Sequence, residues 1–211
     1  MEEWKETRDY VYIVMEYCVG GSLRRYIMDN KENPMSEEMA AVILRQICLA
    51  VDKLHSLQII HRDLTTNNVL LCDRINVKEP PPVWLRIKLC DFGLVADQTR
   101  QPARTMLGTP GFADPAMERG PYNEEVDFFS LGCLLYSMLA GVDPPQRGPI
   151  SFGNRNFSSD AVDLIKQLRS KTIRSVQGSS TRNKKSRLFL RAEMSGYRPP
   201  EKREQEAGRT G

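Results

Sequence analysis

The clearest hydrophobic pattern along the chain predicts an amphipathic helix that ends near His55. Its apolar positions recur at intervals of three or four residues, at Ala40, Ile43, Ile47, Ala50 and Leu54. Ser36 is a plausible N-cap, because its hydroxyl can accept a hydrogen bond from a free amide of the first turn. Glu37 and Glu38 follow, where the helix dipole favours negative charge. One face of this helix should therefore lie in a core.

Three further segments have helical patterns. Ser22 precedes a short helix over residues 23–29, and a last helix is expected over Ser159 to Leu168. Between them, Val126 to Leu139 is apolar on nearly every side. A helix without a polar face has to be surrounded by other elements, so this one is predicted to be buried.

Extended structure is expected in fewer places. Residues 10–17, YVYIVMEY, are aromatic and β-branched and stop before Gly20-Gly21, which predicts one strand and a turn. Asn68 to Cys72 and Ile87 to Cys90 are short apolar segments, separated by a stretch with three consecutive prolines. Proline cannot occupy a central strand, so the two segments are predicted to form a hairpin with a long loop. The predicted fold class is α+β and mainly helical.

Charge divides the chain into a body and a tail. Residues 1–165 hold 17 basic and 23 acidic residues, a net charge of −6, whereas residues 166–211 hold 13 basic and 4 acidic, a net charge of +9. The basic end carries little apolar content and should be disordered apart from Leu188-Phe189-Leu190. Such a tail could bind nucleic acid or acidic membranes, but it lacks the interleaved aromatic residues of many nucleic-acid-binding segments, and a solvated tail is favoured.

The cysteines and the apolar runs indicate an intracellular protein. The five cysteines are odd in number and scattered, without the paired spacing of a zinc site or a disulfide framework. No apolar run approaches the ~20 residues that cross a bilayer. The first residues, MEEWKETRD, are too acidic for a secretory signal. We expect no membrane span and a cytoplasmic location, with the nucleus as an alternative.

Two polar motifs carry the candidate chemistry. His61-Arg62-Asp63-Leu64 is followed by Asn68, and Asp91-Phe92-Gly93 stands at the end of the second hairpin arm. Phosphoryl transfer needs a carboxylate to orient the attacking hydroxyl, which suits Asp63. It also needs oxygen ligands that hold Mg²⁺ against the phosphates, which suits Asn68 and Asp91. Either motif alone is a common turn, but together and in this order they resemble the protein-kinase signature, and this resemblance implies ATP and Mg²⁺ as cofactors.

With MEYCVGGSL before them and GTPGF after them, these motifs resemble the catalytic domain of the serine/threonine protein kinases. The resemblance covers about Asp9 to Leu168 and implies a protein substrate with a Ser or Thr acceptor. It divides the chain into a remnant of the N lobe with the last strand and the start of the hinge (1–17), a partial C lobe (18–168) and the basic tail (169–211).

The resemblance also implies individual roles. Met15 would be the gatekeeper beside adenine, the backbones of Glu16 and Cys18 would hydrogen-bond the base, and Leu70 would form the apolar floor beneath it. His61 and Phe92 would support the catalytic loop. Asp127 would accept backbone N–H groups from that loop; the alternative is a solvated helix N-cap.

Regulation is expected in the segment that follows Asp91. Thr105 precedes Gly108-Thr109 by the spacing at which related kinases carry a regulatory phosphate. Such a phosphate could pair with Arg62. An unmodified loop threonine is the equal alternative.

One substitution narrows the family. Two residues after Asp63 the chain has Thr65, where serine/threonine kinases usually have lysine. HRDLTTNNVLL resembles the polo-like kinases, and among them the polo-like kinase four group of centriole-duplication kinases, which implies a centrosomal or centriolar location. Threonine cannot supply the positive charge that the lysine places near the transferred phosphate.

Several departures from the family pattern argue against kinase activity of this chain alone. Nothing before Tyr10 provides a glycine-rich loop, a phosphate-gripping lysine or its glutamate partner, so these 211 residues alone should have no measurable kinase activity. Asp114-Pro115-Ala116 replaces Ala-Pro-Glu, and the sequence after Asp143 leaves no room for a substrate-docking helix. Two alternatives stay open: an inactive kinase-like scaffold or decoy isoform, and a mis-spliced, truncated or mispredicted reading frame.

Overall fold

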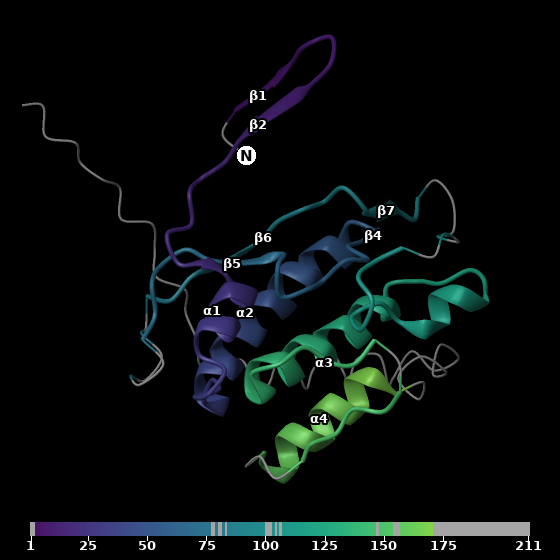
Figure 1. Ribbon diagram of the computed structural model, residues 1–211. Coiled ribbons are helices and arrows are strands. Elements are labelled where there is room, and N and C mark those ends of the chain that lie inside the picture. Colours follow the sequence, from purple (N-terminus) through teal and green to yellow (C-terminus); the bar gives the residue numbers. More distant parts are fainter. Residues whose placement is uncertain are drawn as a thin grey trace, which may run out of the picture.

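The computed structural model describes residues 3–76, 79, 82, 84–99, 103, 105, 107–146, 148–153 and 157–170. A helical body carries the core, and a β-hairpin projects from it (Figure 1). In chain order the strands are β1 (Glu3–Glu6), β2 (Val11–Val14), β3 (Gly21–Ser22), β4 (Ile59–Ile60), β5 (Val69–Leu71), β6 (Ile87–Leu89) and β7 (Ala96–Asp97). The helices are α1 (Leu23–Asp29), α2 (Glu37–Ser56), the 3-10 helix η1 (Pro115–Arg119), α3 (Glu125–Ala140) and α4 (Ser159–Arg169).

The predicted N-caps begin α1 and α2. The Ser22 hydroxyl accepts a hydrogen bond from the amide of Arg25, and the Ser36 hydroxyl accepts one from the amide of Met39. The predicted apolar face of α2 is confirmed at Ala40, Ile43 and Ile47, which are buried, while Ala50 and Leu54 are half-buried. These caps and this face orient α2 against the rest of the core.

The predicted buried helix is α3, which lies between α2 and α4 (Figure 1). Fourteen of its sixteen residues are buried, so neighbouring elements cover it on every side. It packs closely on α4: a Cβ on Gly132 would stand 3.0 Å from the Leu168 Cβ and 3.3 Å from the Ile165 carbonyl oxygen. Only glycine lets the two helices approach this far without a shift.

Small sheets connect the helices to the loops of the body. β5 pairs antiparallel with β6, which confirms the predicted hairpin, and β3 adds to the other edge of β5. β4 pairs antiparallel with β7. The sequence did not predict β3, β4 or β7, because two-residue strands have no periodicity of their own.

The N-terminal region differs from the prediction of a single strand. Residues 3–14 form an antiparallel hairpin, in which Glu3 pairs with Val14 and Glu6 with Val11. All eight strand residues are exposed, on both faces of the hairpin. The first strand was missed because EWKE is mostly charged, which is unusual in strands.

Among its described residues, the segment between α3 and α4 contains no helix. The rings of Phe152 and Phe157 pack on that of Tyr136 of α3, with centroids 6.2 and 6.4 Å away, and on each other at 5.5 Å. The helix predicted over 159–168 is confirmed as α4. The predicted tail, including Leu188-Phe189-Leu190, lies outside the described residues beyond Ser170.

Candidate functional site

The loop after β4 is held on α3 by one buried carboxylate. Asp127 is fully buried, and its two oxygens accept hydrogen bonds from the backbone amides of His61 and Arg62, both at 2.9 Å. The same carboxylate shares a 2.8 Å hydrogen bond with Nε2 of His55 on α2. A buried carboxylate is costly unless it is satisfied in this way, so Asp127 fixes the loop to both helices.

Asp63 is held from both sides. Thr109 donates to its Oδ1 through the backbone amide at 2.9 Å and through the hydroxyl at 2.7 Å. Asn68 donates from Nδ2 to its Oδ2 at 2.9 Å and to its carbonyl oxygen at 2.8 Å. The Asp63 carboxylate therefore has a defined orientation without any ligand.

Close approach of two loops makes the contact with Thr109 possible. Gly108 has φ +113°, and a Cβ there would stand 2.7 Å from the carbonyl oxygen of Arg62. Both the conformation and the spacing require glycine. Gly108 thus brings the following threonine within reach of Asp63.

Asp91 lies apart from these hydrogen bonds. It has φ +60°, an uncommon conformation for a residue other than glycine, and its carboxylate is exposed. Its Oδ1 accepts a hydrogen bond from the Gly93 amide at 3.3 Å. The strained backbone turns an acidic side chain outward at the end of β6.

The ring of Phe92 packs on that of His61, with centroids 5.2 Å apart. His61 is fully buried, whereas Phe92 is 47% exposed. Burial lowers the pKa of His61, and the carboxylates of Asp127, Asp63 and Asp91 and the Cys90 backbone oppose this only in part. His61 is therefore neutral at pH 7 and links the two motifs by packing.

Arg62 has φ +69° and turns its side chain toward the segment after Asp91. Its guanidinium donates to the carbonyls of Leu94 and Val95, the latter at 3.0 Å, and to the Tyr122 hydroxyl at 3.3 Å. Tyr122 in turn donates to the carbonyl of Thr105 at 2.6 Å. Arg62 and the exposed Thr105 are thus connected through Tyr122.

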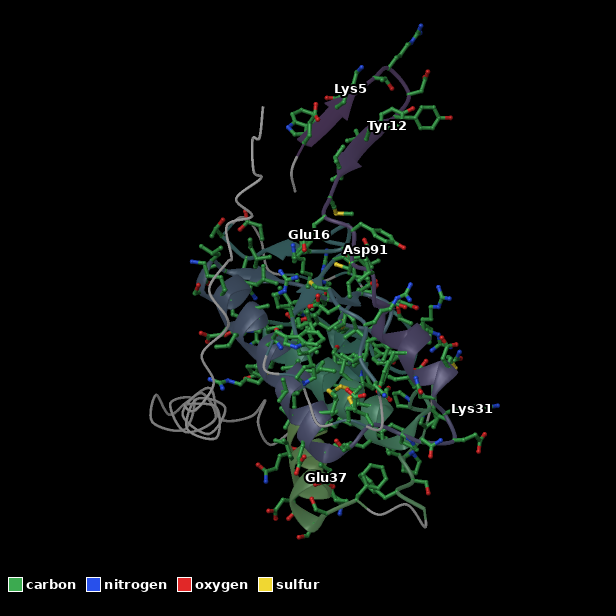
Figure 2. All side chains as sticks on the ribbon, turned by 90° about the vertical axis from the view of Figure 1, so that its left-hand side faces the viewer. Lys5, Tyr12, Glu16, Lys31, Glu37 and Asp91 are labelled. Carbon is green, nitrogen blue, oxygen red and sulfur yellow. The ribbon has the colours of Figure 1, made fainter. Side chains whose placement is uncertain are left out.

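The residues expected around adenine are only partly brought together. Met15 is 58% exposed on the segment between β2 and β3, and Glu16 forms an ion pair with Lys88 of β6. Cys18 is buried, and half-buried Leu70 lies in β5 opposite Ser22. Figure 2 shows Glu16 where the hairpin joins the body, and Asp91 at the same end of the body.

Two departures from the family pattern have clear positions. Thr65 is buried at 2% exposure, so it cannot extend toward a ligand as a lysine would. Asp114 is buried and caps η1 by accepting a hydrogen bond from the Ala116 amide at 2.7 Å, while Glu118 is exposed. Glu118 therefore does not take the buried place of the glutamate that the family pattern has here.

Three residues with contacts in the site were missed by the sequence interpretation: Thr109, His55 and Tyr122. Thr109 stands in the GTPGF motif, which was used to assign the family but not to assign a contact with Asp63. His55 ends the apolar face of α2 and gave a signal only as a polar residue on that face. Nothing in the sequence marks Tyr122.

The donor set suits Mg²⁺ bound together with phosphates. Because Asn68 uses its amide N–H groups on Asp63, its side-chain oxygen is left as an acceptor, and Asp91 offers an exposed carboxylate. Mg²⁺ commonly takes one or two carboxylates and completes its shell with phosphate and water. The described residues contain no group of three or more His, Cys, Asp or Glu that could hold a metal ion. None of the helices described combines the length and apolar character of a bilayer span.

Comparisons with known proteins agree with the motifs. The model of the protein kinase domain matches residues 1–194. The probable serine/threonine-protein kinase zyg-1 of Caenorhabditis elegans is 37% identical over 161 residues, which are 75% of this chain and 21% of that protein. Serine/threonine-protein kinase PLK4 of Danio rerio is 36% identical over 178 residues, covering 77% of this chain and 18% of the relative.

A third relative, serine/threonine-protein kinase CLA4 of Eremothecium gossypii, is 38% identical over 153 residues, or 69% of this chain and 18% of that protein. The chain spans about a fifth of the length of these curated relatives. The predicted resemblance is confirmed: the chain belongs to the protein kinase domain family and is related to the polo-like serine/threonine kinases.

Proposed function

We propose that this chain carries the hydroxyl-orienting and metal-binding half of a serine/threonine protein kinase site, within the C lobe of that fold. The observation that carries the proposal is the fixed carboxylate of Asp63, which accepts hydrogen bonds from Thr109 and Asn68. The loop that carries Asp63 is in turn anchored to α3, because Asp127 accepts a hydrogen bond from the amide of His61. A preoriented carboxylate is what the attacking hydroxyl of a protein substrate needs.

Each residue has a separate part in the proposed reaction. Asp63 accepts the hydrogen bond of the Ser or Thr hydroxyl and orients its oxygen toward the γ-phosphate of ATP. Asn68 and Asp91 would hold Mg²⁺, which supplies positive charge against the phosphate oxygens when bound. Thr109 and Asn68 keep Asp63 from rotating away.

Adenine would lie beside the segment between β2 and β3. Met15 would border the base, the backbones of Glu16 and Cys18 would hydrogen-bond it, and Leu70 would lie beneath it. Support comes from Leu70, which stands in β5 directly after the loop that carries Asp63 and Asn68.

Phosphorylation of Thr105 would put a dianion near Tyr122, where it could draw Arg62 away from Leu94 and Val95. A centriolar location belongs to the same proposal and rests on the resemblance to polo-like kinase four.

Nucleotide binding is tested by thermal denaturation with ATP, with and without Mg²⁺. Stabilisation by ATP that requires Mg²⁺ is expected for the native chain. Asp91→Asn should abolish the Mg²⁺-dependent part, because it removes the exposed carboxylate. Asp63→Asn is the matched control and should keep it. An equal Mg²⁺-dependent shift in the Asp91→Asn variant, or none in the native chain, contradicts the proposal.

Phosphoryl transfer is tested separately with radiolabelled ATP and casein. These 211 residues contain no glycine-rich loop or phosphate-gripping lysine before Tyr10, so transfer by this chain alone should stay at background. Robust labelling that disappears in the Asp63→Asn variant would show that the half-site suffices for catalysis.

A further inference from the structure

Two cysteines face each other where the hairpin joins the body. Cys18 lies between β2 and β3, and Cys72 follows β5 directly. Their Sγ atoms are 3.8 Å apart, and both residues are buried, at 7% and 5% exposure. Among the described residues this is the one sulfur–sulfur contact within hydrogen-bonding distance.

The backbone holds both cysteines in place. Gly20 donates from its amide to the Leu71 carbonyl at 3.1 Å, and Gly21 pairs with Leu71 in the β3–β5 ladder. The two segments approach so closely that a Cβ on Gly20 would stand 2.3 Å from the carbonyl oxygen of Asp73. On its other side, Cys72 donates from its amide to the Arg86 carbonyl at 3.0 Å. The thiols are therefore neighbours because the ladder keeps them so.

The two Sγ atoms are close enough for a small movement to join them covalently. A disulfide has an S–S length of about 2.05 Å, so the sulfurs need to approach by about 1.8 Å. Rotation of two side chains can supply a movement of this size while the backbone pairing stays intact. We propose that Cys18 and Cys72 form an oxidation site, which a hydroperoxide converts into a disulfide that links the chain before β3 to the end of β5.

The reaction balances with one hydroperoxide. One thiolate attacks a peroxide oxygen and breaks the O–O bond, which gives a sulfenic acid and, for hydrogen peroxide, a hydroxide ion. The other thiolate then attacks the sulfenic sulfur, forms the S–S bond and breaks the S–O bond, which releases a second hydroxide. Each hydroxide takes up the proton that a thiol released when it ionised and becomes water. The two thiols lose two electrons and the peroxide gains them.

Cys72 acts as a nucleophile in either order of these steps, on the peroxide or on the sulfenic acid. Burial and the neighbouring Cys18 raise the pKa of Cys72 to about 11, while Arg86 and Lys88 lower it in part. These cations are themselves paired, Arg86 with Asp73 and Lys88 with Glu16. Because the thiolate is the reactive form, cross-linking should be slow at pH 7 and faster at pH 9.

The cross-link would join two points that are 54 residues apart in the chain. It should raise the melting temperature by several degrees, because it restricts the unfolded chain. It would also fix the segment that attaches the hairpin to the body. Formation of the disulfide rests on the contact itself and does not depend on the proposed kinase reaction.

The test uses the full 211-residue chain and hydrogen peroxide. After oxidation at pH 9, free thiols are alkylated and the protein is digested with trypsin without reductant. The sequence places Cys18 in peptide 9–24, Cys72 in 63–74 and Cys90 in 89–100, so each pairing gives a distinct mass. Peptides 9–24 and 63–74 should be recovered joined, about 2 Da below the sum of their masses, and should separate with dithiothreitol.

Cys72→Ser should abolish both the joined peptide and the reversible rise in melting temperature. Cys90→Ser is the matched control: it removes a half-buried thiol of the same region and should leave both intact. The native chain keeps the proposal testable if a variant fails to fold. Recovery of 9–24 joined to 89–100, or of unlinked peptides after prolonged exposure to excess peroxide, would overturn it.

Discussion

Helix α3 and the β1–β2 hairpin show opposite relations between a segment and the rest of the molecule. Nearly every residue of α3 is buried, and its one buried carboxylate, Asp127, organises the loop that carries Asp63. All strand residues of the hairpin are exposed, and it extends away from the body (Figure 1). The helical body therefore fixes the geometry of the candidate site, whereas the hairpin adds exposed apolar surface without adding to the core.

Removing the carboxylate of Asp127 should have the largest effect on this body. Asp127→Ala leaves the amides of His61 and Arg62 and the ring of His55 without their acceptor. Each buried donor that loses its acceptor costs about 1–3 kcal/mol, and three donors lose theirs here. Urea denaturation followed by circular dichroism measures the loss in free energy of unfolding.

The matched control for this variant is Asp163→Ala on α4, where the side chain is exposed. It should change the free energy of unfolding by no more than about 0.5 kcal/mol. Equal losses in the two variants would mean that the hydrogen bonds of Asp127 do not anchor the loop.

Two isoleucines, one in each region, allow the contributions of the body and the hairpin to stability to be compared directly. Ile43 of α2 is fully buried, whereas Ile13 of β2 is 55% exposed. Truncation of a buried isoleucine costs about 2–5 kcal/mol through lost burial and a cavity, so Ile43→Ala should destabilise the body by that amount.

Ile13→Ala should change the free energy of unfolding by only about 0.5 kcal/mol, because the residue is mostly in solvent. Both variants lose the same atoms from the same residue type, and the same urea experiment measures them. A cost for Ile13→Ala as large as that for Ile43→Ala would show that the hairpin is packed in solution.

The sequence predicted the regular elements that carry strong local signals. Ser22 and Ser36 are caps as expected, because capping depends on a few adjacent residues. The burial of α3 followed from apolar residues on all its faces. The pairing of β1 with β2 was not predicted, because the charged first strand has no apolar alternation. The register of the two strands is set instead by the turn between them.

The site was predicted as a set of residue types but not as a geometry. The motifs selected Asp63, Asn68 and Asp91, and their proposed roles stay predictions. The positive φ values of Arg62 and Asp91 could not be read from the sequence, because neighbouring elements impose them. The contact of Thr109 with Asp63 joins residues 46 positions apart and depends on the close approach at Gly108.

The smallest expected effect is a dependence of the free energy of unfolding on pH, which arises from a histidine in the helical body. Both histidines of the chain lie there, at positions 55 and 61, and the hairpin has none. Burial lowers the pKa of His61 below the value of 6.5 that it has when solvated. As the pH falls through 6.5, the unfolded chain therefore binds a proton at this residue before the folded protein does, and acid favours unfolding.

Between pH 6.5 and about 5, above the range in which most carboxylates titrate, this group should lower the free energy of unfolding by at most about 1.4 kcal/mol per pH unit. His61→Phe keeps a ring to pack on Phe92 but cannot take up a proton, so its urea midpoint should fall less between pH 7.5 and 5.5 than that of the native chain. Ile13→Ala serves as the control from the hairpin and should keep the native pH dependence. If the His61→Phe and native chains lose the same free energy over this interval, the acid sensitivity arises elsewhere in the body, and the burial of His61 does not create it.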